Sequence, residues 1–252
     1  MAIFKSGNPT LTEKRFEKTI QAYSDGSTMT QSGTLNKFGI MMLLVIAAAS
    51  FTWKAAAEGK DVMPWMLGGA IGGLIVVIAL TFKPQWSPIG APIYALLTGA
   101  FVGGISAYYN NAFQEIAPNI IMQAVGLTFG VVIAMFVLYH FKIIKATERF
   151  RSVVFTATAG IAIFYALSWI LGMFGVTMPL IHENTTMGIV FSLVVVAIAA
   201  LNLILDFDMI EKGSSMGAPK FMEWYGAFAL VVTIVWLYIE ILRLLSKISS
   251  RD

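Results

Sequence analysis

The sequence contains no cysteine and only two histidines, His140 and His182. Without cysteine there is no disulfide framework, no thiolate nucleophile and no cysteine-ligated zinc site. The two histidines lie far apart along the chain, which excludes the HExxH arrangement that holds zinc in many metalloproteases. We therefore expect no resident metal and no other cofactor.

Charged residues are also scarce. Only 12% of the 252 residues are charged, whereas 58% are hydrophobic. Soluble domains carry about 25% charged residues, so this chain lacks the polar surface needed to face water. The net charge of +3 does not suggest a nucleic-acid partner, and the N-terminus lacks the apolar run of a cleavable signal peptide. The composition predicts an integral membrane protein.

Seven apolar runs are long enough to cross a bilayer, whose core of ~30 Å requires about 20 residues per helix. They lie at residues 38–57, 63–83, 88–109, 119–141, 151–175, 187–210 and 222–246. The runs are apolar throughout, unlike the alternating strands of a membrane β-barrel. We predict an all-α seven-transmembrane helical bundle over residues 38–252. Residues 1–37 form a polar cytoplasmic segment, with a short surface helix followed by a linker over 24–36.

The loops predict the orientation, because Lys and Arg accumulate on the cytoplasmic side. With the N-terminus inside, twelve of the 17 basic residues fall on the inner side and five on the outer side. We therefore predict a cytoplasmic N-terminus in a plasma membrane, which in a bacterium is the inner membrane. Three of the outer five lie near the C-terminus, and a half-inserted last helix would return them to the cytoplasm. That alternative stays open.

Acids inside an apolar run point to function, since burying a charge in the bilayer costs several kcal/mol. Asp206 lies about one turn inside the cytoplasmic end of the sixth run, followed by Asp208. Two residues turn a helix by about 200°, so the two carboxylates point to nearly opposite faces and one is expected to face the bundle. The alternative is that both cap the helix end in headgroup water. Lys83 ends the second run on the same side, as a boundary anchor or as a counter-ion of one aspartate.

Two further spacings concern helix contacts. Glu240 and Arg243 are three residues apart near the outer end of the seventh run, which predicts a local outer ion pair. Glycines at four-residue spacing favour close approach of helices in lipid. Such pairs lie in the second, third and fourth runs: Gly68 with Gly72, Gly69 with Gly73, Gly99 with Gly103, and Gly126 with Gly130.

Two segments of the sequence resemble the Bax inhibitor family, membrane proteins that share the transmembrane Bax-inhibitor motif. DFDMIEKG is similar to the sixth-helix signature of that family, and EWYGAFALVVTIVWLYIEILRLL is similar to its closing helix. SPIGAPIYALLTGAFVGGIS adds weaker support, and the bacterial branch is the most similar. The resemblance implies six helices around a central seventh and a calcium leak that is gated by pH.

The resemblance also implies roles for particular residues. In the family, aspartates on helices six and seven share a proton, and the first pairs alternately with a basic residue of helix two. Carried over, Asp206 matches the helix-six aspartate, Asp208 takes a glutamine position and Lys83 takes the basic position. Thr233 stands where the helix-seven aspartate is expected, so a pair of carboxylates cannot form there. Any pH response is then expected from Asp206 against Lys83.

We therefore expect a calcium leak channel, in which Asp206 and the Thr233 hydroxyl form a weak, transient cation site. The alternative is a non-catalytic regulator that binds a membrane-anchored protease or another membrane protein through its polar N-terminal segment. A proton-coupled transporter also stays open, since intramembrane acids relay protons. We do not expect an enzyme, because the sequence lacks the GxGD and GxSG motifs of intramembrane proteases.

Overall fold

The computed structural model describes residues 27–175, 178 and 185–250. Within them, seven α-helices are long and apolar enough to cross a membrane. They are α2 (Gln31–Ala57), α3 (Met63–Phe82), α4 (Ser87–Phe113), α5 (Ile120–His140), α6 (Glu148–Met173), α8 (Thr186–Ser215) and α9 (Met222–Ser249). A short 3-10 turn, η1 (Pro84–Trp86), leads into α4. The predicted all-α seven-helix membrane bundle is confirmed.

Large apolar side chains cover the outside of this bundle. Leu43, Met122 and Trp169 are each more than two-thirds exposed, and many other apolar side chains are about half exposed. A continuous apolar surface of this kind is unfavourable in water but favourable against lipid tails. The helices also satisfy their own backbone hydrogen bonds, as a membrane-spanning segment must.

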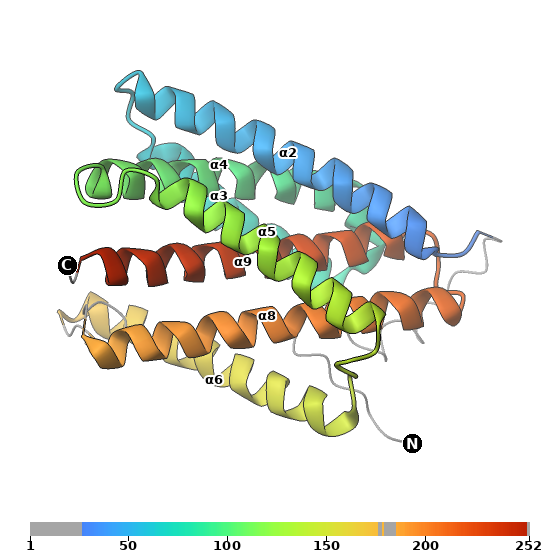
Figure 1. Ribbon diagram of the computed structural model, residues 1–252. Helices are drawn as coiled ribbons and strands as arrows, with labels where there is room; N and C mark the ends of the chain where they lie inside the picture. The colour runs from blue at the N-terminus through green and yellow to red at the C-terminus, as the bar shows by residue number, and fades with distance from the viewer. Residues whose placement is uncertain (1–26, 176–177, 179–184, 251–252) are drawn as a thin grey trace.

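The last helix, α9, lies at the centre of the bundle. It packs against α2, α4, α5 and α8, while α3 packs on α4, and α6 packs on α8. Figure 1 shows α9 running through the middle, between α2 on one side and α8 on the other. Of the seven helices, α9 has the largest buried share. The expectation of a central seventh helix is confirmed.

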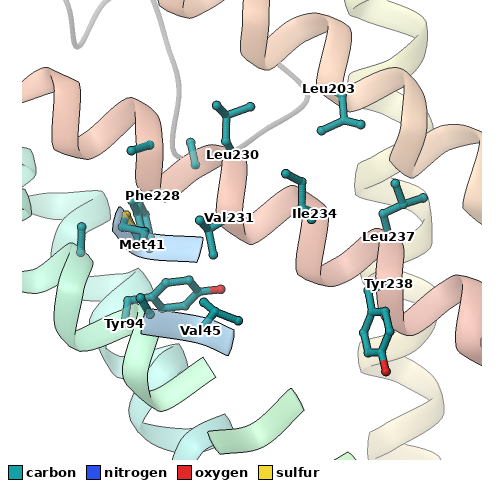
Figure 2. Close-up of a cluster of buried hydrophobic side chains, with 14 of the residues drawn as sticks. Met41, Val45, Tyr94, Leu203, Phe228, Leu230, Val231, Ile234, Leu237 and Tyr238 are labelled. Atoms are coloured by element: carbon teal, nitrogen blue, oxygen red, sulfur yellow. The ribbon is translucent and has the colours of Figure 1, made fainter. Parts of the chain in front are cut away.

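The core follows from this arrangement, because side chains leave α9 in every direction and meet a different helix on each side. Figure 2 shows Leu237 and Tyr238, adjacent residues of α9, pointing to opposite sides. Tyr94 of α4 lies edge-on to Phe228 of α9, with ring centroids 4.8 Å apart. Leu203 of α8 belongs to the same buried cluster. Close packing on all sides fixes the position of α9.

Glycines allow two of the helix contacts. A Cβ atom at Gly103 of α4 would overlap Thr52 and the backbone of α2, and one at Gly69 of α3 would overlap the backbone of α4. The predicted close approaches are therefore confirmed for Gly69 in the second run and for the third run, whereas a Cβ at Gly68 meets nothing within 4 Å. Gly126 and Gly130 of α5 have no atom within 4 Å of such a Cβ, so the prediction for the fourth run is wrong. Both glycines are exposed, so they lie on the outer face of α5 and not at a contact with another helix.

Two helix boundaries differ from the sequence prediction. α2 begins at Gln31, inside the predicted linker, because the Thr30 side chain caps it by accepting a hydrogen bond from Gly33 N. α8 continues to Ser215, because the polar residues after Asp208 stay helical until the turn at Gly217, where φ is 71°. Asp206 therefore lies nine residues from the end of α8, about 14 Å along its axis, and not one turn from it. The predicted surface helix falls outside the described residues.

Candidate functional site

A buried carboxylate and a hydroxyl meet where α8 packs on α9. Asp206 is fully buried and Thr233 is 3% exposed. Thr233 Oγ1 donates a hydrogen bond of 2.6 Å to Asp206 Oδ2. A donor at this place offsets part of the cost of taking the carboxylate out of water. The structure thus brings together the two residues of the predicted cation site.

Asp208 faces a different helix. Because α8 lies between α9 and α6, a rotation of about 200° carries the side chain from the α9 side to the α6 side. Arg151 Nη2 of α6 donates to Asp208 Oδ2, and Lys212 Nζ lies 3.2 Å from the same oxygen. Arg151 is 3% exposed. Both aspartates therefore face protein, which corrects the expectation that only one of them does.

Lys83 is the counter-ion of neither aspartate in this structure. Its side chain is exposed at the end of α3, with Nζ 4.9 Å from the centroid of the Trp86 ring. The reason is the position of α3, which packs on α4 at the edge of the bundle, whereas α8 packs on α9, α5 and α6. The predicted pairing is therefore wrong, and the cation that meets Asp208 from another helix is Arg151.

A cavity of about 650 Å³ opens beside Asp208, where α5 and α8 end. Acidic and basic side chains both line it, and Leu230 of α9 lies on its wall. Asp206 does not line this cavity, although Asp208 does. The charged or titratable residues on its wall are Tyr139, His140, Lys142, Lys145, Asp208, Glu211 and Lys212. The cavity, called the vestibule below, thus has charged groups on a partly apolar wall and does not reach the buried Asp206–Thr233 pair.

A family model described as Bax inhibitor 1 like matches residues 8–250, which is nearly the whole chain. The chain belongs to the Bax inhibitor family. No curated protein and no solved structure matches it. The match covers both segments that suggested the family, together with the helices between and before them.

The opposite end of the bundle in this Bax inhibitor family member holds a second charged cluster. Arg243 Nη1 lies 2.9 Å from Glu240 Oε2, the pair expected from the spacing. Tyr165 of α6 joins it, donating to Glu240 over 3.0 Å and accepting from Arg243 over 2.7 Å. Glu240 is 1% exposed, so the pair is buried and linked to a second helix rather than a local surface contact.

Lys247, one turn beyond Arg243, is buried at the same end. Its Nζ donates to the carbonyl oxygen of Gly188 over 3.1 Å and to Ser192 Oγ over 3.0 Å, both in the first turns of α8. In the prediction of orientation, Lys247 was one of the three basic residues counted near the C-terminus. Its position one turn after Arg243 on the same helix could have suggested an inward side chain.

A further buried charge, Glu223, connects the start of α9 to α2. Its carboxylate accepts hydrogen bonds from Thr30 N and Thr30 Oγ1, each of 2.9 Å, and pairs with Lys37 and Lys220. Next to it, Met29 N donates to Ala218 O over 2.6 Å. Sequence reasoning missed this site, because Lys37 and Lys220 were read as loop charges. An acid in the first turn of a helix, between two lysines, is the pattern that could have indicated it.

Proposed function

We propose that this Bax inhibitor family protein is a cation leak channel of the membrane, with calcium as its permeant ion. The observation that carries the proposal is the fully buried Asp206 carboxylate, which meets the Thr233 hydroxyl between the two inner helices α8 and α9. Oxygen atoms of this kind are the ligands that a hard cation such as Ca²⁺ prefers. A carboxylate in the interior of a membrane protein is costly, which points to a functional role.

The site is suited to passage rather than to storage of an ion. Among the residues that the structure describes, no group of three or more His, Asp or Glu side chains is placed to hold a metal. A cation at Asp206 would therefore not be held by a cluster of acidic or histidine side chains. Conduction requires binding that is favourable enough for the ion to enter and weak enough for it to leave.

In this proposal, Arg151 of α6 is the cation that closes the pore, the role that the family resemblance implied for a basic residue of helix two. Together with Lys212, it holds Asp208 at the wall of the vestibule and closes the way to Asp206. A buried ion pair between α6 and α8 has two states, paired and separated. Separation of the two helices removes Arg151 from Asp208, while Lys212 stays on α8 with it, and Asp208 can then attract the permeant ion.

The proposal includes a pH response through Asp206. Protons and the permeant cation compete for the same carboxylate. Acidification therefore lowers the affinity of Asp206 for calcium, and we expect flux to fall toward acid pH.

Ion flux into proteoliposomes tests the proposal. Calcium and potassium uptake are compared for the wild type, Asp206→Asn and the exposed-acid control Glu115→Gln, between about pH 5 and pH 8. Loss of a charged ligand worth about 1.5–3 kcal/mol should lower the calcium flux of Asp206→Asn about tenfold or more and abolish its pH dependence. Glu115→Gln should match the wild type. Absence of wild-type flux under every condition would remove the channel proposal.

One observation favours a second role, as a non-catalytic regulator that binds a membrane-anchored protease or another membrane protein. Two residues within the polar N-terminal segment (1–37) are fixed to the neighbouring helices: Met29 to Ala218 in the α8–α9 turn, and Thr30 to Glu223 at the start of α9. A partner bound to residues 1–24 would thus act close to both inner helices. Deleting residues 1–24 spares these contacts; flux should survive in a channel, and partner capture should be lost in a regulator.

A further inference from the structure

A second cavity, of about 420 Å³, lies inside the membrane-spanning part of the bundle. Four helices line it, and one of them is the central helix α9. The wall is made by Met42, Val45, Ile46, Ala49, Ser50 and Trp53 of α2, Val102, Gly103 and Ser106 of α4, Ile121, Val125, Thr128 and Phe129 of α5, and Ile234, Val235 and Tyr238 of α9. Its volume lies within the range of about 300–1,000 Å³ that is usual for small-ligand sites.

The side chains on the wall of this cavity favour an apolar ligand. Most of the lining side chains are hydrocarbon, and three of the polar ones are already hydrogen-bonded within the protein. Ser106 Oγ and Tyr238 Oη lie 2.6 Å apart, and Thr128 Oγ1 donates to Ala124 O over 2.7 Å. A polar or charged ligand would lose water without gaining partners on this wall.

The cavity faces the lipid side of the bundle. Ile46 of α2 and Phe129 of α5 lie on its rim, and they are 50% and 42% exposed. α2 and α5 both pack on α4 and α9, and the cavity lies between them. The occupant can therefore arrive sideways from the bilayer, along a surface that is already apolar.

The dimensions of the cavity point to one occupant. Along α2 the lining extends from Met42 to Trp53, which corresponds to about 16 Å of helix. That length is close to half of the ~30 Å hydrocarbon core, the depth of a single leaflet. Trp53 lies four residues before the end of α2, at the level where tryptophan side chains gather near lipid headgroups.

We propose that this cavity is a binding site for one acyl chain of a bilayer phospholipid. The headgroup lies at the level of Trp53, and the chain runs inward along α2 and α5 to the face of α9. Tyr238 and Ser106 form the polar pair on the inner wall, so the chain packs directly against the central helix. Neither the ion nor any gate enters this proposal, and it stands or falls separately from the leak-channel function.

Photocrosslinking tests the proposal. The full-length protein is reconstituted with a phospholipid that carries a diazirine in one acyl chain, and crosslinked residues are mapped by mass spectrometry. We expect crosslinks on the lining residues Met42, Ile121 and Tyr238 above the level found on exposed side chains such as Ile163. Val125→Trp fills the cavity and should reduce these crosslinks at least fivefold, and Ile121→Trp repeats the test at a second position.

The matched control is Val137→Trp, which adds the same ring to α5 at a position that is 41% exposed. It should leave the crosslinks unchanged. Equal labelling of wild type and both filled variants would overturn the proposal, as would labelling no stronger than at Ile163. A free diazirine fatty acid is the second arm. If it labels the cavity and excess phospholipid does not compete, the occupant is a free fatty acid and the assignment to a bilayer lipid is wrong.

Discussion

The Thr233 hydroxyl donates to Asp206, at the place where the family resemblance led us to expect a second carboxylate. Thr233→Val keeps the shape of the side chain and removes the donor. A buried acceptor that loses a donor costs about 1–3 kcal/mol, so we expect a lower thermal unfolding midpoint in detergent. Thr233→Ser, which keeps the hydroxyl, should lie close to the wild type. An unchanged midpoint for Thr233→Val would mean that the bond contributes nothing to stability.

Gly33 gives a second test at the scale of one residue. A Cβ atom there would overlap the Glu223 carboxylate, whereas one at Gly39 of the same helix meets nothing within 4 Å. Gly-to-Ala changes inside a helix ordinarily stabilise it by about 1 kcal/mol. We therefore expect Gly39→Ala to be neutral or stabilising and Gly33→Ala to lower the unfolding midpoint by displacing Glu223. The same response from both variants would contradict the close contact.

Single residues also show what the sequence could predict. The depth of Asp206 within an apolar run marked it as buried, and the three-residue spacing of Glu240 and Arg243 marked them as a pair. Arg151 was missed because it precedes the apolar part of its run and was counted as a loop cation. Its partner comes from another helix, and neither hydropathy nor spacing carries information about contacts between helices.

At the scale of helices, the position of α8 between α6 and α9 decides what its two aspartates can do. If Arg151 of α6 closes the inner route, Arg151→Ala should raise calcium flux several-fold in proteoliposomes. The exposed loop residue Lys142 lines the same vestibule, and Lys142→Ala should leave the flux near the wild-type level.

The loss of one partner from a buried ion pair also destabilises a protein, by about 3–5 kcal/mol. Arg151→Lys therefore serves as a second variant, because it keeps the charge and shortens the reach. Its flux should fall between those of the wild type and Arg151→Ala. Flux of Arg151→Ala at or below the wild-type value, in protein shown to be folded, would exclude a closing role for Arg151.

At the scale of the whole molecule, an odd number of spans places the two ends of the helical part on opposite sides of the membrane. The chain has no cysteine, so single cysteines report topology without background. We expect Lys145→Cys to react with a membrane-impermeant maleimide only from the cytoplasmic side and Lys60→Cys only from the other side. Labelling of both positions from one side would contradict the seven-span arrangement.

The number of spans could be read from run lengths, but the central place of the last helix could not. α5 and α9 are almost equally apolar, yet α9 is far more buried. Hydropathy reports only that a segment leaves water, because lipid tails and a protein core are equally apolar. The family resemblance supplied the central position, and packing around α9 confirms it.

The turn that joins α8 to α9, to which Met29 is hydrogen-bonded, limits how the two helices can move. Because α8 and α9 are connected at this turn, they can separate only by pivoting about it. Asp206 lies about 14 Å from the connected end of α8 and Ser192 about 35 Å from it, so a given swing moves Ser192 roughly two and a half times as far. The bond between Lys247 and Ser192 would therefore stretch further than the bond between Thr233 and Asp206 when the helices part. The distance between Lys247 and Ser192 is therefore a sensitive measure of how far α8 and α9 separate at the buried carboxylate.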